Sequence, residues 1–160
     1  KIPAGVETGN RIQLAGRGEV GAGGGPAGDL YVEIVEAEHP YLIRDGHNLH
    51  VAIEVSFAAA SLGTKVKVEC LDGEIDVEVR AGTQSGATIP VRGKGMTRLR
   101  AGTRGDLIVH VEVQTPHKLN REQEELLRKF ASSRGEKPGD VKIKGHEQGF
   151  FSKFRDAFGR

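Results

Sequence analysis

Apolar and polar residues alternate along most of the first 115 positions, with the two-residue period of strands that bury one face. The alternation is clearest in the segments 30–34, 49–57, 65–70, 74–79 and 107–113. Asp72 and Gly73 separate two of these segments and predict a hairpin turn. Strands with one dry and one wet face are typical of sandwiches of antiparallel sheets. The chain is therefore predicted to be mostly β.

The sequence of this β-rich part is repeated. The stretch that begins at Ala4 aligns without a gap with the stretch that begins at Ala81, and Gly5 corresponds to Gly82, an offset of 77 residues. Six glycines coincide in the two copies. Glycines at equal places indicate equal backbone needs, such as a positive φ or the close approach of two chain segments. We expect two copies of one β module, each with a long flap between two strands.

The second copy follows three predicted strands between residues 49 and 79, whereas the first follows none. About 46 residues rarely bury enough surface to fold alone, so the first module is expected to be truncated, with its opening strands upstream of Lys1. The predicted fold class is mostly β: two tandem, related β-sandwich domains, the first truncated at its N-terminus, then a C-terminal helix and tail. The predicted segments are 1–46 (first domain), 47–118 (second domain), 119–135 (helix) and 136–160 (linker and tail).

Helical patterns interrupt the alternation in two places. A short helical turn is expected over Phe57–Gly63, ending at the glycine. Further on, Asn120 and Gln123 have the spacing of a capping box, and Gly135 marks the end of that helix. Its apolar stripe consists of Leu126, Leu127, Phe130 and Ala131.

The tail carries a second apolar stripe on a mildly basic segment. Residues 117–160 hold 11 Lys+Arg and 7 Asp+Glu. Four phenylalanines fall on one helical face there, namely Phe150, Phe151, Phe154 and Phe158. Such a face is expected to be covered. Docking on this protein or on a second copy is favoured, and a membrane surface is the alternative.

Composition excludes several function classes. A net charge of +1 argues against a nucleic-acid binder that works through bulk charge. The single cysteine, Cys70, allows no intrachain disulfide and no cysteine-based zinc site, and its alternation with core positions predicts a buried thiol. No metal site is expected at His39, His47 and His50, and no set of acid, base and nucleophile can be assembled. The chain is predicted not to be an enzyme.

The flap Arg92–Arg104 of the second copy is the most basic stretch. It carries Arg92, Lys94, Arg98, Arg100 and Arg104, without acidic neighbours in the sequence. A solvated flap is the favoured interpretation. The alternative is a nucleic-acid-associated β module that contacts phosphates through this flap. No aromatic residues interleave for base stacking, so nucleic acid is not an expected partner.

The stretches KIPAGVETGNRIQLAGRGE, HPYLIRDGHNL, GTQSGATIPVRGKGM and LNREQEELLRKF are distinctive. They resemble the C-terminal substrate-binding region of DnaJ, the bacterial J-domain co-chaperone family, from Lys1 to about Phe130. The resemblance implies an apolar groove that binds unfolded clients for delivery to DnaK, and a C-terminal segment that pairs two chains. The J domain, the Gly/Phe linker and the CxxCxGxG repeats that bind zinc are not in this sequence. No cofactor is therefore expected here, and zinc is expected only upstream.

By this resemblance, Ile12, Leu14 and Leu42 line the client groove, while core packing is an equal alternative for Ile12 and Leu14. An apolar groove beside a sheet edge can accept an extended peptide by strand addition. The dimer contacts implied by the resemblance are Leu126, Leu127 and Phe130. The predicted function is a cytoplasmic chaperone or co-chaperone fragment. Its expected partners are unfolded polypeptides, DnaK and a second copy of the chain, and no membrane.

Overall fold

The computed structural model describes residues 2–99, 101–137 and 139. It divides into two compact units, Lys1–Pro116 and His117–Arg160, which are described separately. The elements of the first unit are β1 (Arg11–Leu14), β2 (Leu30–Glu33), β3 (Ile43–Asp45), β4 (Asn48–Ser56), α1 (Phe57–Leu62), β5 (Thr64–Cys70), β6 (Gly73–Val79), β7 (Thr88–Val91) and β8 (Leu107–Gln114). The second unit contains α2 (Arg121–Ser133). The four tail phenylalanines and Arg100 lie outside the described residues.

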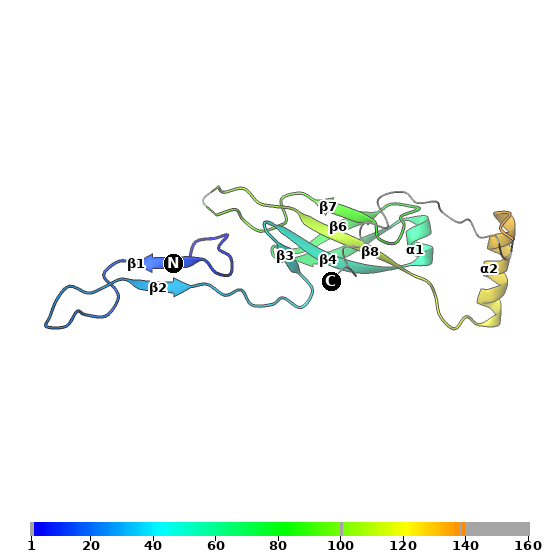
Figure 1. The fold of residues 1–160 in the computed structure, drawn as a ribbon. Helices are drawn as coiled ribbons and strands as arrows, with labels where there is room; N and C mark the ends of the chain where they lie inside the picture. Colours follow the sequence, from blue (N-terminus) through cyan, green and yellow to red (C-terminus); the bar gives the residue numbers. More distant parts are fainter. Residues whose placement is uncertain (1, 100, 138, 140–160) are drawn as a thin grey trace. The chain divides into compact units, whose positions relative to one another are not determined.

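The strands of the first unit form a four-stranded sheet of order β3-β4-β8-β7, a ribbon of β5 and β6, and a separate pair of β1 and β2 (Figure 1). The predicted β-rich sandwich is confirmed, with one correction to the expected antiparallel sheets. β4 and β8 pair in parallel, from Leu49 opposite Leu107 to Ser56 opposite Gln114. Parallel strands need a long crossover connection. Here α1, the β5–β6 ribbon and β7 supply it, so β8 returns in the direction of β4.

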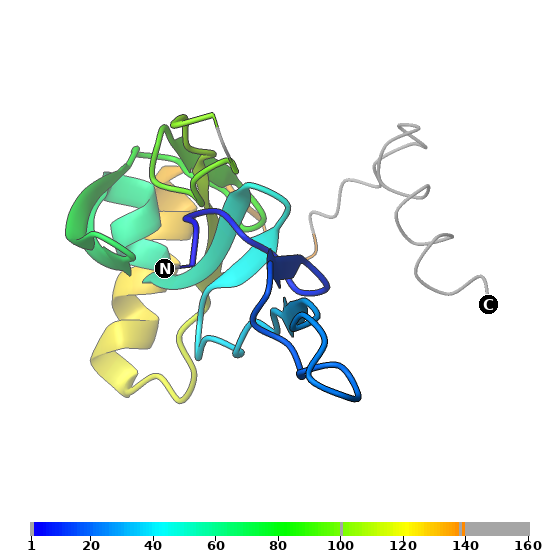
Figure 2. The same ribbon diagram turned by 90° about the vertical axis from the view of Figure 1, so that its left-hand side faces the viewer.

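The core lies between the four-stranded sheet and the ribbon, and both views of the molecule show these two layers (Figures 1 and 2). Leu49 and Val51 of β4, together with Leu107 and Val109 of β8, form one buried cluster with Val68, Cys70 and Val77 of the ribbon. A second cluster joins the far end of the sheet to α1 through Val55, Ala60, Val79 and Val111. Strands β4, β5, β6 and β8 thus bury alternate positions as the sequence pattern predicts, whereas all four residues of β2 are exposed.

Several local predictions are confirmed. The Cys70 thiol is buried and donates to the carbonyl of Gly73 across the predicted hairpin turn, at 3.1 Å. Gly63 ends α1 with a φ of 83°. In α2, Asn120 and Gln123 form both hydrogen bonds of the capping box. These bonds satisfy N–H groups at the helix start that would otherwise lack partners.

The repeat extends to the register of the strands. Ile12 lies opposite Val32 in the β1–β2 pair, and Ile89 lies opposite Val109 in the β7–β8 pair, each 77 positions later. Both flaps fold back through an isolated bridge, Val20 to Ala27 in the first copy and Thr97 to Arg104 in the second. The two copies therefore share one backbone arrangement.

Three flap glycines are required because backbone segments approach them closely. A Cβ atom on Gly95 would lie 2.5 Å from the carbonyl oxygen of His47, and one on Gly105 would lie 1.9 Å from it. In the first copy, a Cβ on Gly18 would lie 2.7 Å from the carbonyl oxygen of Asp29. These distances are shorter than any non-bonded carbon can adopt, so the glycines at 18 and 95 are needed for the same close packing of flap limbs.

The predicted domain boundary at residue 46 falls inside the second module. β3 pairs with β4, with Ile43 opposite His50, and Leu42 is buried in the core cluster of the sheet. Gly46 and His47 form the tight turn between the paired residues Asp45 and Asn48, and Gly46 has a φ of 55°. Proline, glycine and aspartate mark a turn inside a domain as readily as a boundary between domains, so the local sequence does not distinguish the two.

Candidate functional site

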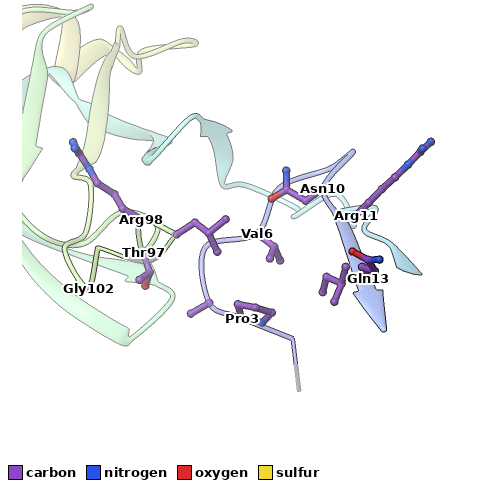
Figure 3. Close-up of a pocket in the computed structure, with 11 residues that line it drawn as sticks. Pro3, Val6, Asn10, Arg11, Gln13, Thr97, Arg98 and Gly102 are labelled. Carbon is purple, nitrogen blue, oxygen red and sulfur yellow. The ribbon is translucent and has the colours of Figure 1, made fainter. Parts of the chain in front are cut away.

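A pocket of about 810 Å³ lies between the segment that precedes β1, β1 itself, and the flap of the second module (Figure 3). The lining residues are Pro3, Ala4, Val6, Asn10, Arg11, Ile12, Gln13, Thr97, Arg98, Leu99 and Gly102. Much of the wall is aliphatic, and no carboxylate is among the lining side chains. Arg11 and Arg98 lie at opposite ends of the pocket, and Figure 3 shows both side chains extending away from it. The lining between them suits an apolar ligand.

Two contacts fix the walls of the pocket relative to each other. The backbone at Gly5 approaches the flap so closely that a Cβ there would lie 2.4 Å from the carbonyl oxygen of Thr97. On the other side, Arg44 of β3 donates to the carbonyl of Val6 at 2.9 Å and to the Glu7 carboxylate at 3.0 Å. Its guanidinium also pairs with Glu36, and the side chain is only 14% exposed. A partly buried, multiply bonded arginine holds its partners better than an exposed ion pair does.

The flap itself is held by Asp72 in the turn of the ribbon. Arg104 donates to the Asp72 carboxylate at 2.7 Å and to the carbonyl of Gly95 at 2.7 and 2.9 Å. Lys94 pairs with the same carboxylate at 3.3 Å. Hydrogen bonds from Arg104, and then from Lys94, lower the pKa of Asp72. The flap therefore does have an acidic neighbour, which corrects the sequence analysis: Asp72 is distant in sequence but adjacent in the fold.

The structure does not bring the three predicted client contacts together. Ile12 is half-buried and lines the pocket, whereas the side chain of Leu14, further along β1, is 41% exposed and lies outside the lining. Their counterparts in the second copy, Ile89 and Val91, pack against the core. Leu42 is 6% exposed and belongs to that core.

Leu42 also contributes to a second pocket, of about 670 Å³. This pocket lies beside β3, and Pro40, Ile43, Leu71 and Met96 are among its lining residues. It differs from the first pocket because Glu36 and Glu38 line it as well.

The predicted dimer contacts lie on α2, of which no residue is buried. Leu126 is 58% exposed, Phe130 is 44% exposed, and Leu127 is half-buried. The guanidinium of Arg134 lies 5.6 Å from the centre of the Phe130 ring. The helix thus presents an amphipathic surface with an apolar stripe.

The side chains of His39, His50 and His110 have hydrogen-bonding partners. His39 accepts the backbone N–H of Leu42 at 3.2 Å, and His50 contacts His110 on the neighbouring strand at 2.8 Å between ring nitrogens. Within the described ranges, no three His, Cys, Asp or Glu side chains are grouped as a metal site. No helix in that part of the chain combines the length and apolar character needed to cross a membrane.

Comparison with known proteins gives matches to two family models. The family model described as "DnaJ C terminal domain" matches residues 1–116, and "Chaperone protein DnaJ C-terminal region" matches residues 122–160. The chain belongs to the DnaJ C-terminal domain family. The family boundary between 116 and 122 coincides with the division of the structure into two units.

Similar curated proteins are DnaJ chaperones of actinobacteria. The chain is 58% identical to "Chaperone protein DnaJ 2" of Streptomyces avermitilis, and equally to that of Streptomyces coelicolor, over 158 residues. It is 48% identical to "Chaperone protein DnaJ 1" of Mycolicibacterium paratuberculosis over 159 residues. These alignments cover 99% of the chain but 42% of each relative. The chain therefore spans less than half the length of these DnaJ proteins.

Neither the flap side of the pocket nor the role of Asp72 was predicted from the sequence. The sequence does carry one indication of the role of Asp72. The two copies share a backbone but differ at the equivalent positions Ala27 and Arg104, and a charged residue added to one copy indicates a partner that the other copy lacks. Val6 and Leu99 carried no such signal, because each is an isolated apolar residue in a polar loop.

The Asp72 contacts predict a pH dependence. Since its pKa is lowered from 3.8, the carboxylate stays charged and holds the flap at higher pH, and this hold is lost as the pH falls through the lowered value. Arg104→Gln should raise the pKa of Asp72 towards its ordinary value, and Lys94→Gln should raise it less. NMR titration of the Asp72 carboxyl carbon measures both. An ordinary pKa of Asp72 in the unaltered chain would contradict its proposed role in holding the flap through Arg104 and Lys94.

Proposed function

We propose that this chain is the client-binding and dimerising part of a cytoplasmic DnaJ-type chaperone, which holds non-native polypeptides for delivery to DnaK. The relatives are named chaperones, and their sequences align with 99% of this chain. The observation that carries the proposal is the open, aliphatic pocket beside β1, since non-native chains differ from folded ones in exposing apolar side chains.

The pocket suits reversible holding. Burial of one aliphatic side chain contributes roughly 1.5–3 kcal/mol, and association loses translational and rotational freedom. A client that inserts one or two side chains between Ile12 and Leu99 is therefore bound weakly and released readily. Weak binding of many apolar segments is what a chaperone for varied clients requires.

Ile12, Leu14 and Leu42 remain the proposed client contacts, with different roles. Ile12 is the one at the open pocket, and Leu14 extends the apolar side of β1 beyond it. Leu42 supports the second pocket from within the core. A charge at Leu42 would disrupt the core itself, so the pocket residue Leu99, which is 39% exposed, gives a cleaner test.

We propose that α2 pairs two chains through Leu126, Leu127 and Phe130. An amphipathic helix without buried residues gains stability by covering its apolar stripe, and a second copy of the same helix offers a matching stripe. Pairing would give each assembly two client sites, which raises the apparent affinity for a long unfolded chain.

The nucleic-acid alternative is less well supported. Lys94 and Arg104 of the flap are engaged by Asp72, which reduces the positive charge available to phosphates. Retardation of labelled RNA or DNA at low salt would favour that alternative.

Substitution within the pocket should reduce chaperone activity. Leu99→Asp places a charge where a client side chain would sit, and we expect the suppression of aggregation of a chemically denatured enzyme to fall several-fold. Leu62→Asp is the matched control, because Leu62 is 81% exposed on α1 and outside the pocket. Light scattering measures both. Equal loss in the two variants, or no loss in either, would exclude the pocket as the client site.

The α2 stripe predicts concentration-dependent pairing. Sedimentation equilibrium of the unaltered chain should show a dimer, and Leu126→Asp should shift the population towards monomer because a charge would be buried in the interface. Glu122→Gln, on the same helix but outside the stripe, should leave the dimer intact. A monomer at all concentrations in the unaltered chain would contradict the proposed interface.

A further inference from the structure

Two histidine side chains meet on the face of the four-stranded sheet that points away from the core. His50 of β4 and His110 of β8 each lie between two buried residues of their own strand. Because side chains alternate along a strand, both imidazoles lie on the face opposite the ribbon. The parallel pairing of β4 with β8 sets Ala52 opposite His110, so the two histidines are diagonal neighbours although 60 positions separate them in the chain (Figure 1).

The two rings approach each other nitrogen to nitrogen. His50 Nδ1 lies 2.8 Å from His110 Nε2, and the ring planes differ by 26°. One of these nitrogens donates a hydrogen and the other accepts it through its lone pair. Neutral imidazole nitrogens are the commonest metal ligands in proteins, and a metal ion can be shared by two that lie this close.

The distance between the two nitrogens distinguishes one metal geometry from another. Nitrogens that bind a metal at about 2.0–2.1 Å lie about 2.9 Å apart when they subtend a right angle, and about 3.3 Å apart at a tetrahedral angle. The observed 2.8 Å is close to the right-angle value. Right angles are typical of tetragonal sites with nitrogen and oxygen ligands, which suit Cu²⁺ and Ni²⁺, and Cu²⁺ is bound more tightly than Ni²⁺.

A carboxylate supports one ring from its other side. The Asp45 carboxylate lies 3.9 Å from Nε2 of His50. It favours the tautomer that carries its hydrogen on Nε2, which leaves the lone pair of Nδ1 directed at His110. Histidines that bind a metal commonly have a carboxylate or a carbonyl at the ring nitrogen that does not bind it.

The pair is open to solvent through a pocket of about 450 Å³, and the side chain of His50 is 28% exposed. The pocket has room for the water molecules that would complete the coordination of an ion. Asp45 lines it, and no lysine or arginine is among its described lining residues. Glu54 and Glu112 lie on the same face of β4 and β8 and are exposed. These carboxylates attract a cation to this face.

We propose that His50 Nδ1 and His110 Nε2 bind one Cu²⁺ ion, with water in the remaining positions. Each ring turns slightly so that both nitrogens face the pocket, and the hydrogen on Nε2 of His110 moves through solvent to Nδ1 of the same ring. The described residues supply no third protein ligand, so the site exchanges its ion rather than enclosing it. The bound ion ties β4 to β8. The site is separate from the proposed client pocket and does not depend on the proposed function.

The first test titrates Cu²⁺ into the chain by isothermal titration calorimetry, with glycine as a competing chelator. His110→Gln removes one of the two nitrogens, and the loss of chelation should weaken binding about a hundredfold. His117→Gln is the matched control, because His117 lies outside the sheet, and it should bind as the unaltered chain does. Equal affinity of the His110→Gln variant and the unaltered chain would overturn the site.

Electron paramagnetic resonance of the Cu²⁺ complex counts the ligands. Spin-echo modulation by the remote ring nitrogens should show two imidazoles in the unaltered chain and one in His110→Gln. A single imidazole in the unaltered chain would overturn the chelating pair. Asp45→Asn should keep both imidazoles but weaken binding about tenfold. An unchanged affinity of that variant would overturn the role of Asp45.

A third measurement needs no variant. Substoichiometric Cu²⁺ should broaden the NMR signals of the His50, Ala52 and His110 amides before those of other residues. Broadening that begins elsewhere in the chain would overturn the location. Zn²⁺ should bind at least about tenfold more weakly than Cu²⁺. Equal or tighter binding of Zn²⁺ would overturn the assignment to copper.

Discussion

The register of one antiparallel strand pair determines most of what this chain can do. In each copy an aspartate carboxylate accepts a glycine N–H at 2.9 Å, Asp29 from Gly16 and Asp106 from Gly93. This bond closes the base of the flap and holds the two strands at one offset. Because side chains alternate along a strand, a slip by one residue would exchange the buried and exposed faces. It would also exchange the inward and outward backbone groups.

The same backbone serves different purposes in the two copies because a few side chains differ. Arg104 lets the second flap bond to Asp72, whereas its counterpart Ala27 offers no such contact. The second flap is thereby positioned as a wall of the pocket. In the first copy, Gln13 of β1 has a backbone N–H, which its counterpart Pro90 lacks. Arg44 fixes the segment that precedes β1 by donating to the carbonyl of Val6. The second module thus supplies one wall of the pocket, and the first supplies the other.

The alternation, the paired glycines and the helix-capping residues were enough to predict the β modules, the flaps and both described helices, because these depend on local sequence. The hairpin turn was predicted one residue late, at Asp72–Gly73, whereas Leu71 and Asp72 form it between the paired residues Cys70 and Gly73. The parallel pairing of β4 with β8 and the bond between Arg104 and Asp72 were not predictable in this way, since each joins residues far apart in the chain. Leu42 shows why the residues of the candidate site could not all be predicted from the sequence. A leucine after His39-Pro40 suits a groove or a core equally well, and only the fold places it in the core.

Both copies hold the same strand register, so alternate backbone groups of β1 and β7 face away from their partner strands. Amide hydrogen exchange of the free chain, measured residue by residue by NMR, distinguishes the inward from the outward groups. Ile12 and Ile89, which bond to their partner strands, should exchange slowly, and Gln13 and Thr88, which face outward, should exchange fast. Slow exchange at Gln13 together with fast exchange at Ile12 would contradict the shared register.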